Sequence, residues 1–259
     1  MADWNARSYH QISAPQQEWG RRVLDRVALA GDETVMDLGC GTGRLTALLA
    51  ERLPRGRVVA FDRSSSMLFE AQPWLRSQAP RVIGIVMGDG ASLPFLRAFD
   101  LIFSTATFHW IPDHGALFRS IITALKRGGR LEAQCGGGRN LAALRARADA
   151  LAREPRFTRF FDGWSEPWHF ADEESTRRRL AAAGFEDIGV SLEPSTVTFA
   201  TPVEFADFIA TVCIRPHLAR LPFEDRAAFT NALTLRSLAD PEPLTLDYWR
   251  LNIRARRPA

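Results

Sequence analysis

Three glycines at alternate positions are the residues of this chain best suited to hold a nucleotide-like ligand. The apolar run 35–38 ends at Gly39, Gly41 and Gly43, and a helical pattern begins at Leu45. Glycine lacks a Cβ atom, so it allows positive φ angles and a close approach of backbone amides to a ligand. The N-terminus of the following helix directs further amides to the same place. The pattern predicts a cofactor-binding turn, although a glycine turn without a ligand gives the same spacing.

Two charged residues beside this turn bear on the type of ligand. Nicotinamide- and flavin-binding turns usually read GxGxxG, but Arg44 stands where that pattern has its last glycine. Asp37, two residues before Gly39, adds a carboxylate that would repel a pyrophosphate. Both features favour a ligand without phosphates, such as S-adenosylmethionine, which carries an ammonium, a sulfonium and two ribose hydroxyls. A nicotinamide-dependent oxidoreductase is the alternative.

Two further acids end apolar runs where a nucleotide-like ligand would need them. Asp62 follows the run 57–61 and lies 23 positions beyond Gly39, where a ribose-binding carboxylate is expected. Asp89 follows the run 82–87 and has a carboxylate that can accept a hydrogen bond from an adenine amino group. The competing interpretations are an ordinary surface aspartate and a plain Gly-Asp-Gly turn.

Taken in order, these segments resemble the class I S-adenosylmethionine-dependent methyltransferases. VMDLGCGTG at 35–43 is similar to their first motif, Asp62 to their ribose-binding acid and Asp89 to their adenine-contacting acid. Residues 100–113 resemble their fourth strand with its loop, and 125–131 resemble the turn before the fifth strand. The resemblance implies S-adenosylmethionine as the cofactor.

The N-terminal residues narrow the resemblance to one branch. Residues 3–6 and Tyr9, together with the run 109–113, are similar to the trans-aconitate methyltransferases and their relatives. The resemblance extends over residues 3–135 and weakens afterwards. The methyl acceptor is expected to bind in the weaker part.

The resemblance and the spacing together imply a set of cofactor-binding residues around the glycine turn. Tyr9 and Trp19 are expected to cover the cofactor as lid aromatics, and Gln11 is expected to reach its amino-acid end. The set is Tyr9, Gln11, Trp19, Asp37, Gly39, Gly41, Thr42, Gly43, Asp62, Arg63, Met67, Asp89, Gly90, Ala91 and Ser104.

The acceptor side of the predicted site is centred on His109, which follows the fourth strand. His109 is the best-placed general base for a hydroxyl, amine or carbon-acid acceptor, and a histidine stacked on Trp110 is the structural alternative. A carboxylate acceptor would need anchoring instead of deprotonation. The predicted acceptor residues are Phe108, His109, Trp110, Trp164, Trp168, Arg215 and His217. Packing is the alternative for the aromatic residues, and a surface position for Arg215 and His217.

These residues favour a methyltransferase that acts on a small molecule, with carboxyl O-methylation of a small organic acid as the first interpretation. The alternative within this class is C- or O-methylation of a hydrophobic natural product, such as a terpenoid, polyketide or aromatic metabolite. Outside enzymes, the same residues suit a cofactor-binding regulator without turnover.

Alternating apolar and helical patterns predict an α/β fold. Strands are expected near 34–38, 57–61, 82–87, 100–104, 130–135, 185–193 and 244–254, and helices near 14–30, 43–52, 65–72, 115–126, 141–152 and 172–183. Such alternation predicts a parallel sheet with helices on both faces. The resemblance implies a Rossmann-like, seven-stranded, mostly parallel sheet whose final strand is antiparallel.

The glycine and proline breaks between the predicted strands and helices indicate three parts. They are an N-terminal helical lid at 1–30, a cofactor-binding core at 31–135, and a remainder at 136–259 that completes the sheet and carries a helical cap. The cap is expected at about 139–171 and 202–238, with breaks at Pro216 and Pro222. Ligands of open α/β sheets bind beyond the carboxyl ends of the strands, so this cap should lie over the acceptor.

Composition agrees with one such enzyme. The 259 residues are 46% hydrophobic and carry a formal charge of +3, with Lys126 as the only lysine. The arginines are interleaved with acids, which argues against a nucleic-acid partner. The absence of a signal peptide pattern and of a membrane-length apolar run predicts a cytoplasmic location. A monomer or homodimer is expected, although no sequence feature identifies the oligomeric state. The cysteines Cys40, Cys135 and Cys213 lie too far apart for metal-ligand spacing, so reduced thiols and no metal are expected.

Overall fold

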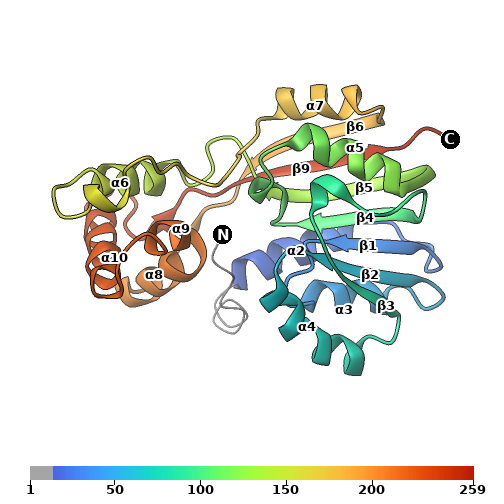
Figure 1. Cartoon of the computed structure of the whole chain (residues 1–259), viewed down its shortest axis with the longest axis horizontal. Helices are drawn as coiled ribbons and strands as arrows, with labels where there is room; N and C mark the ends of the chain where they lie inside the picture. The colour runs from blue at the N-terminus through green and yellow to red at the C-terminus, as the bar shows by residue number, and fades with distance from the viewer. Residues whose placement is uncertain (1–13) are drawn as a thin grey trace.

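A seven-stranded sheet organises the computed structural model, which describes residues 14–259 (Figure 1). Its strand order is β3-β2-β1-β4-β5-β9-β6. Every pairing is parallel except those of β9, which runs antiparallel to β5 and β6. The strands are β1 (Thr34–Leu38), β2 (Arg57–Asp62), β3 (Val82–Met87), β4 (Phe99–Thr105), β5 (Leu125–Gly136), β6 (Glu186–Pro194) and β9 (Trp249–Arg256). The predicted fold class, including the antiparallel final strand, is confirmed.

Helices cover both faces of this sheet because successive strand residues point to opposite sides. Val35 packs into an apolar cluster with α2 (Ala14–Arg26), α3 (Arg44–Glu51) and α4 (Ser65–Gln78). Its neighbour Met36 packs on the other face, in a cluster with α5 (His114–Ala124) and α7 (Glu173–Ala182). None of the helices between Ala14 and Ala259 has both the length and the apolar character of a membrane span.

Local capping explains where several helices begin. The side chain of Ser64 accepts a hydrogen bond from Met67 N at the start of α4, and Asp113 accepts one from Ala116 N at the start of α5. The helix predicted at 65–72 does not stop before Pro73 but runs on to Gln78. Burial of Leu75 beneath the glycine turn stabilises this last part. The first helix ends earlier than expected, at Arg26.

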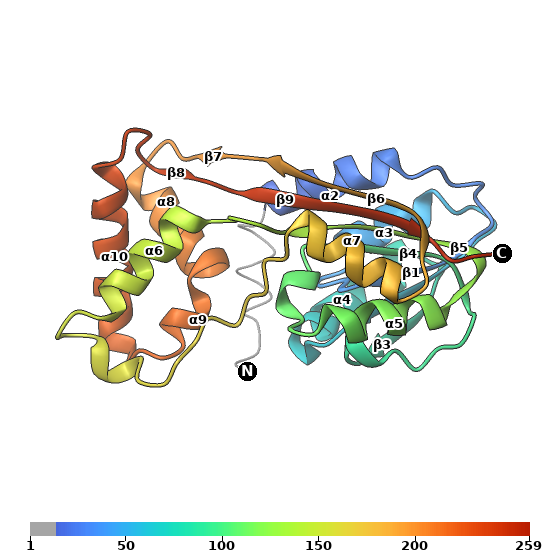
Figure 2. The ribbon, with the colours of Figure 1, turned by 90° about the horizontal axis from the view of Figure 1, so that it is seen from above.

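The predicted closing strand 244–254 is two strands. A short β8 (Thr245–Leu246) pairs with β7 (Val197–Thr198) in a separate two-stranded sheet, and β9 begins three residues later at Trp249. Between them Tyr248 N donates back to Leu246 O at 3.0 Å, and the Tyr248 ring packs into the core of the cap. In Figure 2, β7 and β8 link the cap to the long strands β6 and β9.

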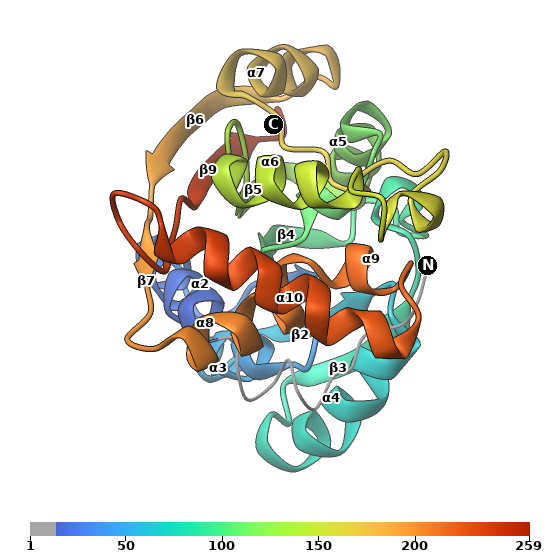
Figure 3. The ribbon, with the colours of Figure 1, turned by 90° about the vertical axis from the view of Figure 1, so that its left-hand side faces the viewer.

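A helical cap lies at one end of the sheet (Figures 1 and 3). It consists of α6 (Ala142–Ala152), α8 (Pro202–Phe208), the π-helical turn η4 (Ile209–Cys213), α9 (Arg215–Leu218) and α10 (Phe223–Leu238). Its own apolar cluster contains Leu144, Phe205, Phe229 and Leu233, together with Trp19 from α2. The breaks expected at Pro216 and Pro222 are confirmed, because each proline lies at a helix start. Single 3-10 turns, η1 (Gly90–Ser92), η2 (Phe108–Trp110) and η3 (Thr158–Phe160), complete the chain.

Candidate active site

The three glycines of the turn after β1 all adopt positive φ, but each is required for a different reason. Gly39 has φ 82°, and a Cβ atom there would lie 1.9 Å from Thr107 Oγ1. A Cβ atom at Gly43, with φ 80°, would lie 2.9 Å from the Leu75 side chain. At Gly41, with φ 54°, a Cβ atom would meet nothing within 4 Å. Gly41 therefore borders open space, whereas Gly39 and Gly43 permit close packing.

The amides of this turn bond within the protein. Gly39 N donates to Phe61 O at 2.7 Å, and Gly43 N donates to Cys40 O at 3.0 Å. Gly41 N donates to Asp62 Oδ2 at 2.8 Å. The three glycine amides are therefore already hydrogen-bonded within the protein. This differs from the sequence-based expectation that these amides face a ligand.

Asp62, at the end of β2, joins the glycine turn to the start of α4. Its Oδ2 accepts from Gly41 N, and its Oδ1 accepts from Ser64 N, both at 2.8 Å. A carboxylate has about four acceptor positions, more than these two backbone bonds use. The carboxylate borders the cavity described next, and can bind a ribose there.

A cavity of about 410 Å³ lies at the carboxyl ends of β1 to β4, where ligands of open α/β sheets bind. We call it the cofactor cavity. Seven of the predicted cofactor residues line it, namely Gly39, Gly41, Asp62, Arg63, Met67, Asp89 and Gly90. The sequence prediction missed Phe61, Thr105, Ala106, Thr107 and Ile111, which line the same cavity. The loop after the fourth strand was the available signal for Thr107 and Ile111.

Asp37 lies beneath the turn and does not line the cofactor cavity. Its carboxylate is 2% exposed and accepts a hydrogen bond from Thr46 Oγ1 at 2.6 Å. Burial raises the pKa of Asp37 to about 7, and the Asp62 charge adds to this. The residue therefore holds α3 against β1, and the repulsion of phosphates expected from it does not operate at the cavity surface.

Other predicted cofactor residues do not line the cofactor cavity but lie next to it or elsewhere. Ser104 Oγ donates to Leu38 O at 2.7 Å, and Ala91 N donates to Asp89 Oδ1 at 2.9 Å. Thr42 and Gly43 lie in the turn but outside the cavity lining. Trp19 packs edge-on against Tyr248 in the cap, with ring centroids 4.9 Å apart, and not over the cofactor cavity. Tyr9 and Gln11 lie outside the described residues.

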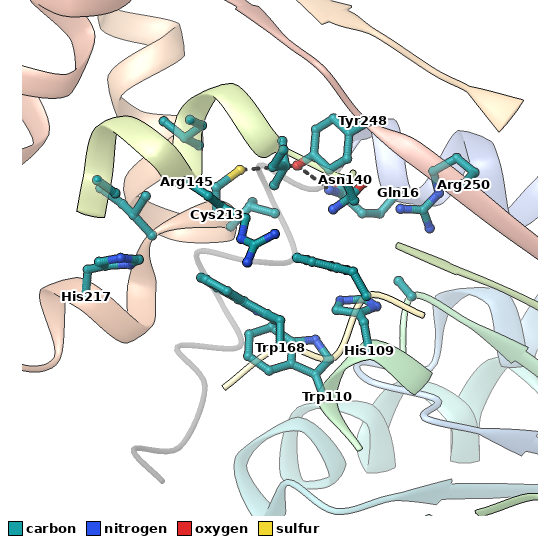
Figure 4. A pocket seen from close by; sticks show the side chains of 17 residues that line it. Gln16, His109, Trp110, Asn140, Arg145, Trp168, Cys213, His217, Tyr248 and Arg250 are labelled. Atoms are coloured by element: carbon teal, nitrogen blue, oxygen red, sulfur yellow. Dashed lines mark hydrogen bonds between the residues drawn. The ribbon is translucent and has the colours of Figure 1, made fainter. Parts of the chain in front are cut away.

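A second, smaller cavity of about 60 Å³ lies between the sheet edge and the cap. We call it the acceptor cavity. It shares Ala106 and Trp110 with the cofactor cavity, so the two adjoin. Figure 4 shows Arg145, Trp168 and His109 between His217 at one end and Arg250 at the other.

Two guanidinium groups line the acceptor cavity, and neither arginine was predicted. Arg250 on β9 is 4% exposed, donates from Nε to Gln134 Oε1 at 3.4 Å and lies 4.5 Å from the Trp19 ring centroid. Arg145 on α6 donates from Nε to Glu166 Oε2 at 2.7 Å. Asn140 and Tyr248 add polar groups to the same lining. Because Glu166 offsets the charge of Arg145, the buried guanidinium of Arg250 carries the preference of this small cavity for an anionic ligand.

His109 lines the acceptor cavity as a neutral ring. Its Nδ1 accepts from Gly136 N at 3.3 Å, which leaves the proton on Nε2. The ring stacks on Phe170 with centroids 5.6 Å apart and lies 5.5 Å from Trp110. Burial lowers the pKa of His109 to about 3, with further contributions from Arg250 and His114. Such a ring is a hydrogen-bond donor and a weak base.

The remaining predicted acceptor residues divide between the cavity and the core. Trp110, Trp168 and His217 line the acceptor cavity, and Trp164 contacts His217 with ring centroids 4.6 Å apart. His217 is fully buried, so its interpretation as a surface residue is wrong. Burial lowers the pKa of His217 to about 4, and Arg145 contributes to the same shift. Phe108 packs in the sheet core, and Arg215 lines neither cavity.

Comparison with known proteins identifies the family. A sequence profile of the methyltransferase domain matches residues 35–129. The trans-aconitate 2-methyltransferase of Methylobacterium radiotolerans is 30% identical over 243 residues, which are 90% of this chain and 88% of that protein. The same enzyme of Variovorax paradoxus is 29% identical over 240 residues, which are 88% of this chain and 86% of that protein.

Solved structures agree on the fold. The S-adenosyl-L-methionine complex of Haemonchus contortus phosphoethanolamine N-methyltransferase 2 superposes with a TM-score of 0.64 at 18% identity, over 98% of this chain and 57% of that one. The YcgJ protein of Bacillus subtilis gives 0.62 at 14% identity, over 94% and 99%. The 30% identity to the Methylobacterium radiotolerans enzyme over most of both chains shows that this chain belongs to the trans-aconitate 2-methyltransferase family of class I S-adenosylmethionine-dependent methyltransferases.

Proposed function

We propose that this enzyme transfers the methyl group of S-adenosylmethionine to a carboxylate of a small organic acid. The observation that carries the proposal is the buried guanidinium of Arg250, with the Glu166-paired Arg145 across from it, on a cavity that adjoins the cofactor cavity at Ala106 and Trp110. The trans-aconitate 2-methyltransferases related to this chain support the same substrate class.

The cofactor cavity fits a ligand that brings hydroxyls and no phosphates. Asp62 would accept hydrogen bonds from the ribose hydroxyls, and Asp89 and Met67 would border the adenine. The amides of Gly39, Gly41 and Gly43 are already bonded within the protein, so the turn has none of them to give to a pyrophosphate. This argues against the nicotinamide alternative more directly than Asp37 does.

The size of the acceptor cavity favours a small acid. A water molecule needs about 10–15 Å³ by the same measure, so a cavity of about 60 Å³ holds roughly four to six waters. A carboxylate with a short carbon skeleton fits this volume, whereas a terpenoid or polyketide would require the cap to move.

The chain's own residues suit a reaction without a general base. When bound, S-adenosylmethionine supplies an activated methyl group on a sulfonium. A carboxylate oxygen forms the new bond to the methyl carbon, the carbon–sulfur bond breaks with its electron pair going to sulfur, and no proton is transferred. Arg250 would anchor the carboxylate, and the Nε2 proton of His109 would orient it. Opposite charges are neutralised in this step, so a cavity that excludes water favours it.

The second candidate is C- or O-methylation of a hydrophobic natural product. The aromatic side of the acceptor cavity, formed by Trp110, Trp168 and Phe170, favours it. Such an acceptor needs a base, and the pKa of His109 at about 3 makes this ring a poor one.

A screen of labelled methyl transfer separates the two candidates. Purified enzyme would be incubated with labelled S-adenosylmethionine and, in separate reactions, small dicarboxylic and tricarboxylic acids including trans-aconitate, terpenoids, and aromatic metabolites. We expect a mass increase of one methyl group on an acid. Transfer to a terpenoid or aromatic compound alone would contradict the proposal. The Asp62→Ala variant provides the background. A cytoplasmic location, no nucleic-acid partner and a monomer or homodimer are part of the same proposal.

A further inference from the structure

Three side chains with metal-binding atoms meet next to the acceptor cavity. Asp149 comes from α6, Glu166 from the loop before α7, and His217 from α9. One ligand atom of each lies within 4.8 Å of those of the other two. Because these residues are far apart in the chain, their spacing gave no metal signal in the sequence.

Two of these residues carry buried polar atoms without a hydrogen-bond partner in the described part of the chain. Both ring nitrogens of His217 and the Oε1 atom of Glu166 are in this state. The His217 ring is 0% exposed and stands among Trp164, Phe161 and Phe229. A buried polar atom without a partner is costly, so such an atom calls for an explanation.

We propose that Asp149, Glu166 and His217 bind a divalent transition-metal ion, for which Zn²⁺ is the best match. Two carboxylate oxygens and one imidazole nitrogen form a ligand set that zinc accepts, and the histidine nitrogen disfavours Mg²⁺ and Ca²⁺. The ion satisfies the Glu166 Oε1 atom and one nitrogen of His217. A zinc ion here ties α6, the 161–172 loop and α9 together behind the acceptor cavity.

Arg145 contributes to this arrangement from outside the ligand set. Both its Nε and Nη2 donate to Glu166 Oε2, which fixes the carboxylate and leaves Oε1 for the ion. Bonds of this kind commonly orient metal ligands. The two carboxylates, one guanidinium and a divalent ion sum to a single positive charge, compared with a single negative charge without the ion.

The side chains need only a small adjustment. Zinc binds oxygen and nitrogen at about 2.0–2.2 Å, so the ligands of a tetrahedral ion lie roughly 3.4 Å apart. The ligand atoms of the three residues now lie within 4.8 Å of one another, so on binding the ion the most distant pair must approach by roughly 1 Å or slightly more. Rotation of the Asp149 side chain, together with pivoting of the Glu166 carboxylate about the Oε2 atom held by Arg145, provides this movement, and both side chains are only partly buried.

Metal counting on the full chain tests the proposal. Untagged enzyme would be stripped with a chelator, titrated with Zn²⁺ in a calorimeter, and analysed by plasma emission after gel filtration. We expect a stoichiometry of one zinc per chain and a higher melting temperature with zinc. Asp149→Asn and His217→Gln should each weaken zinc binding roughly 10- to 100-fold or more.

Asp162→Asn is the matched control, because Asp162 is an exposed carboxylate in the same loop but outside the cluster. It should bind zinc as the unmodified chain does. Binding of no zinc, or equal binding in the control and the Asp149→Asn variant, would overturn the proposal. Asp149→Asn decides the result if His217→Gln does not fold, and circular dichroism reports on folding in each case. Since the readout is metal content, failure here leaves the proposed methyl transfer untouched.

Discussion

The two cavities of this enzyme are built in opposite ways. The cofactor cavity, about 410 Å³, is lined by residues between 38 and 111, at the ends of consecutive strands. The acceptor cavity, about 60 Å³, draws its lining from segments as distant as Gln16 and Arg250. One is therefore a local product of the sheet, and the other exists only once the cap has packed against it.

The cavities also differ in what makes their walls. Around the cofactor cavity, glycine backbone and two carboxylates, Asp62 and Asp89, form much of the polar wall. Around the acceptor cavity, long side chains such as Arg145 and Arg250 project from different layers. A variant in one cavity should therefore change one ligand's affinity and leave the other's nearly unchanged.

Arg250→Met is expected to give the largest difference between the effects on the acceptor and on the cofactor. If Arg250 anchors an anionic acceptor as proposed, removal of this buried charge costs about 2–5 kcal/mol, so kcat/KM for the acid acceptor should fall roughly 30- to 5000-fold. The affinity for S-adenosylmethionine, measured by calorimetry, should stay within about threefold. Arg256→Met, at a half-exposed arginine of the same strand, is the control and should change neither value. An equal loss in both ligands would show that the cavities are not independent.

Gly39→Ala should weaken ligand binding in the cofactor cavity, which Gly39 lines. The new Cβ atom would lie 1.9 Å from Thr107 Oγ1, and such overpacking costs about 1–3 kcal/mol, so cofactor affinity should fall roughly 5- to 160-fold. Gly128→Ala is the control, because Gly128 also has positive φ, 70°, but has no atom within 4 Å of its Cβ position. Similar cofactor affinity in both variants would count against the close packing at Gly39.

Asp62→Ala removes the carboxylate without adding bulk. We expect S-adenosylmethionine binding to weaken by roughly 10- to 100-fold, because hydrogen bonds to a charged group are worth about 1.5–3 kcal/mol. Calorimetry measures this directly, with Glu51→Ala on the exposed end of α3 for comparison. Unchanged affinity would remove Asp62 from the cofactor site.

The smallest effect is expected from His109→Ala. Burial lowers the pKa of this ring from 6.5 to about 3, so it gains a proton only when the pH falls towards 3 and stays neutral between about pH 5 and 9. The pH profile of kcat should therefore show no acidic limb near 6.5, and the variant should lose less than about tenfold in turnover. A limb near 6.5 that the variant abolishes, with a loss of roughly 100-fold, would make His109 a base.

The difference between the cavities also explains what the sequence could predict. Gly39, Gly41 and Asp62 were predicted because strand, turn and strand are local patterns, and the sheet aligns their ends. Asp37 was expected at the ligand but is buried beneath the turn. The direction of its side chain depends on a partner from another element, Thr46 on α3, which the local strand pattern does not reveal. The glycine amides were expected to face a ligand, but Phe61 O, Asp62 and Cys40 O accept from them.

His109, Trp110, Trp168 and His217 of the acceptor cavity were predicted, but its two arginines could not be predicted, for a topological reason. Arg250 reaches the acceptor cavity because β9 inserts between β5 and β6. The strand is also interrupted at Tyr248, just before β9 begins. Arg145 reaches the acceptor cavity from a helix of the cap. In a chain with many scattered arginines, no local pattern distinguishes these two from surface residues.

The chemical nature of the new bond tests the central claim most directly. Enzyme incubated with methyl-labelled S-adenosylmethionine and trans-aconitate would be treated with mild base, and the volatile label would be measured. An ester releases its methyl group as methanol under these conditions, so we predict that the transferred label becomes volatile. Transfer of label into a product that mild base does not cleave would contradict carboxyl methylation.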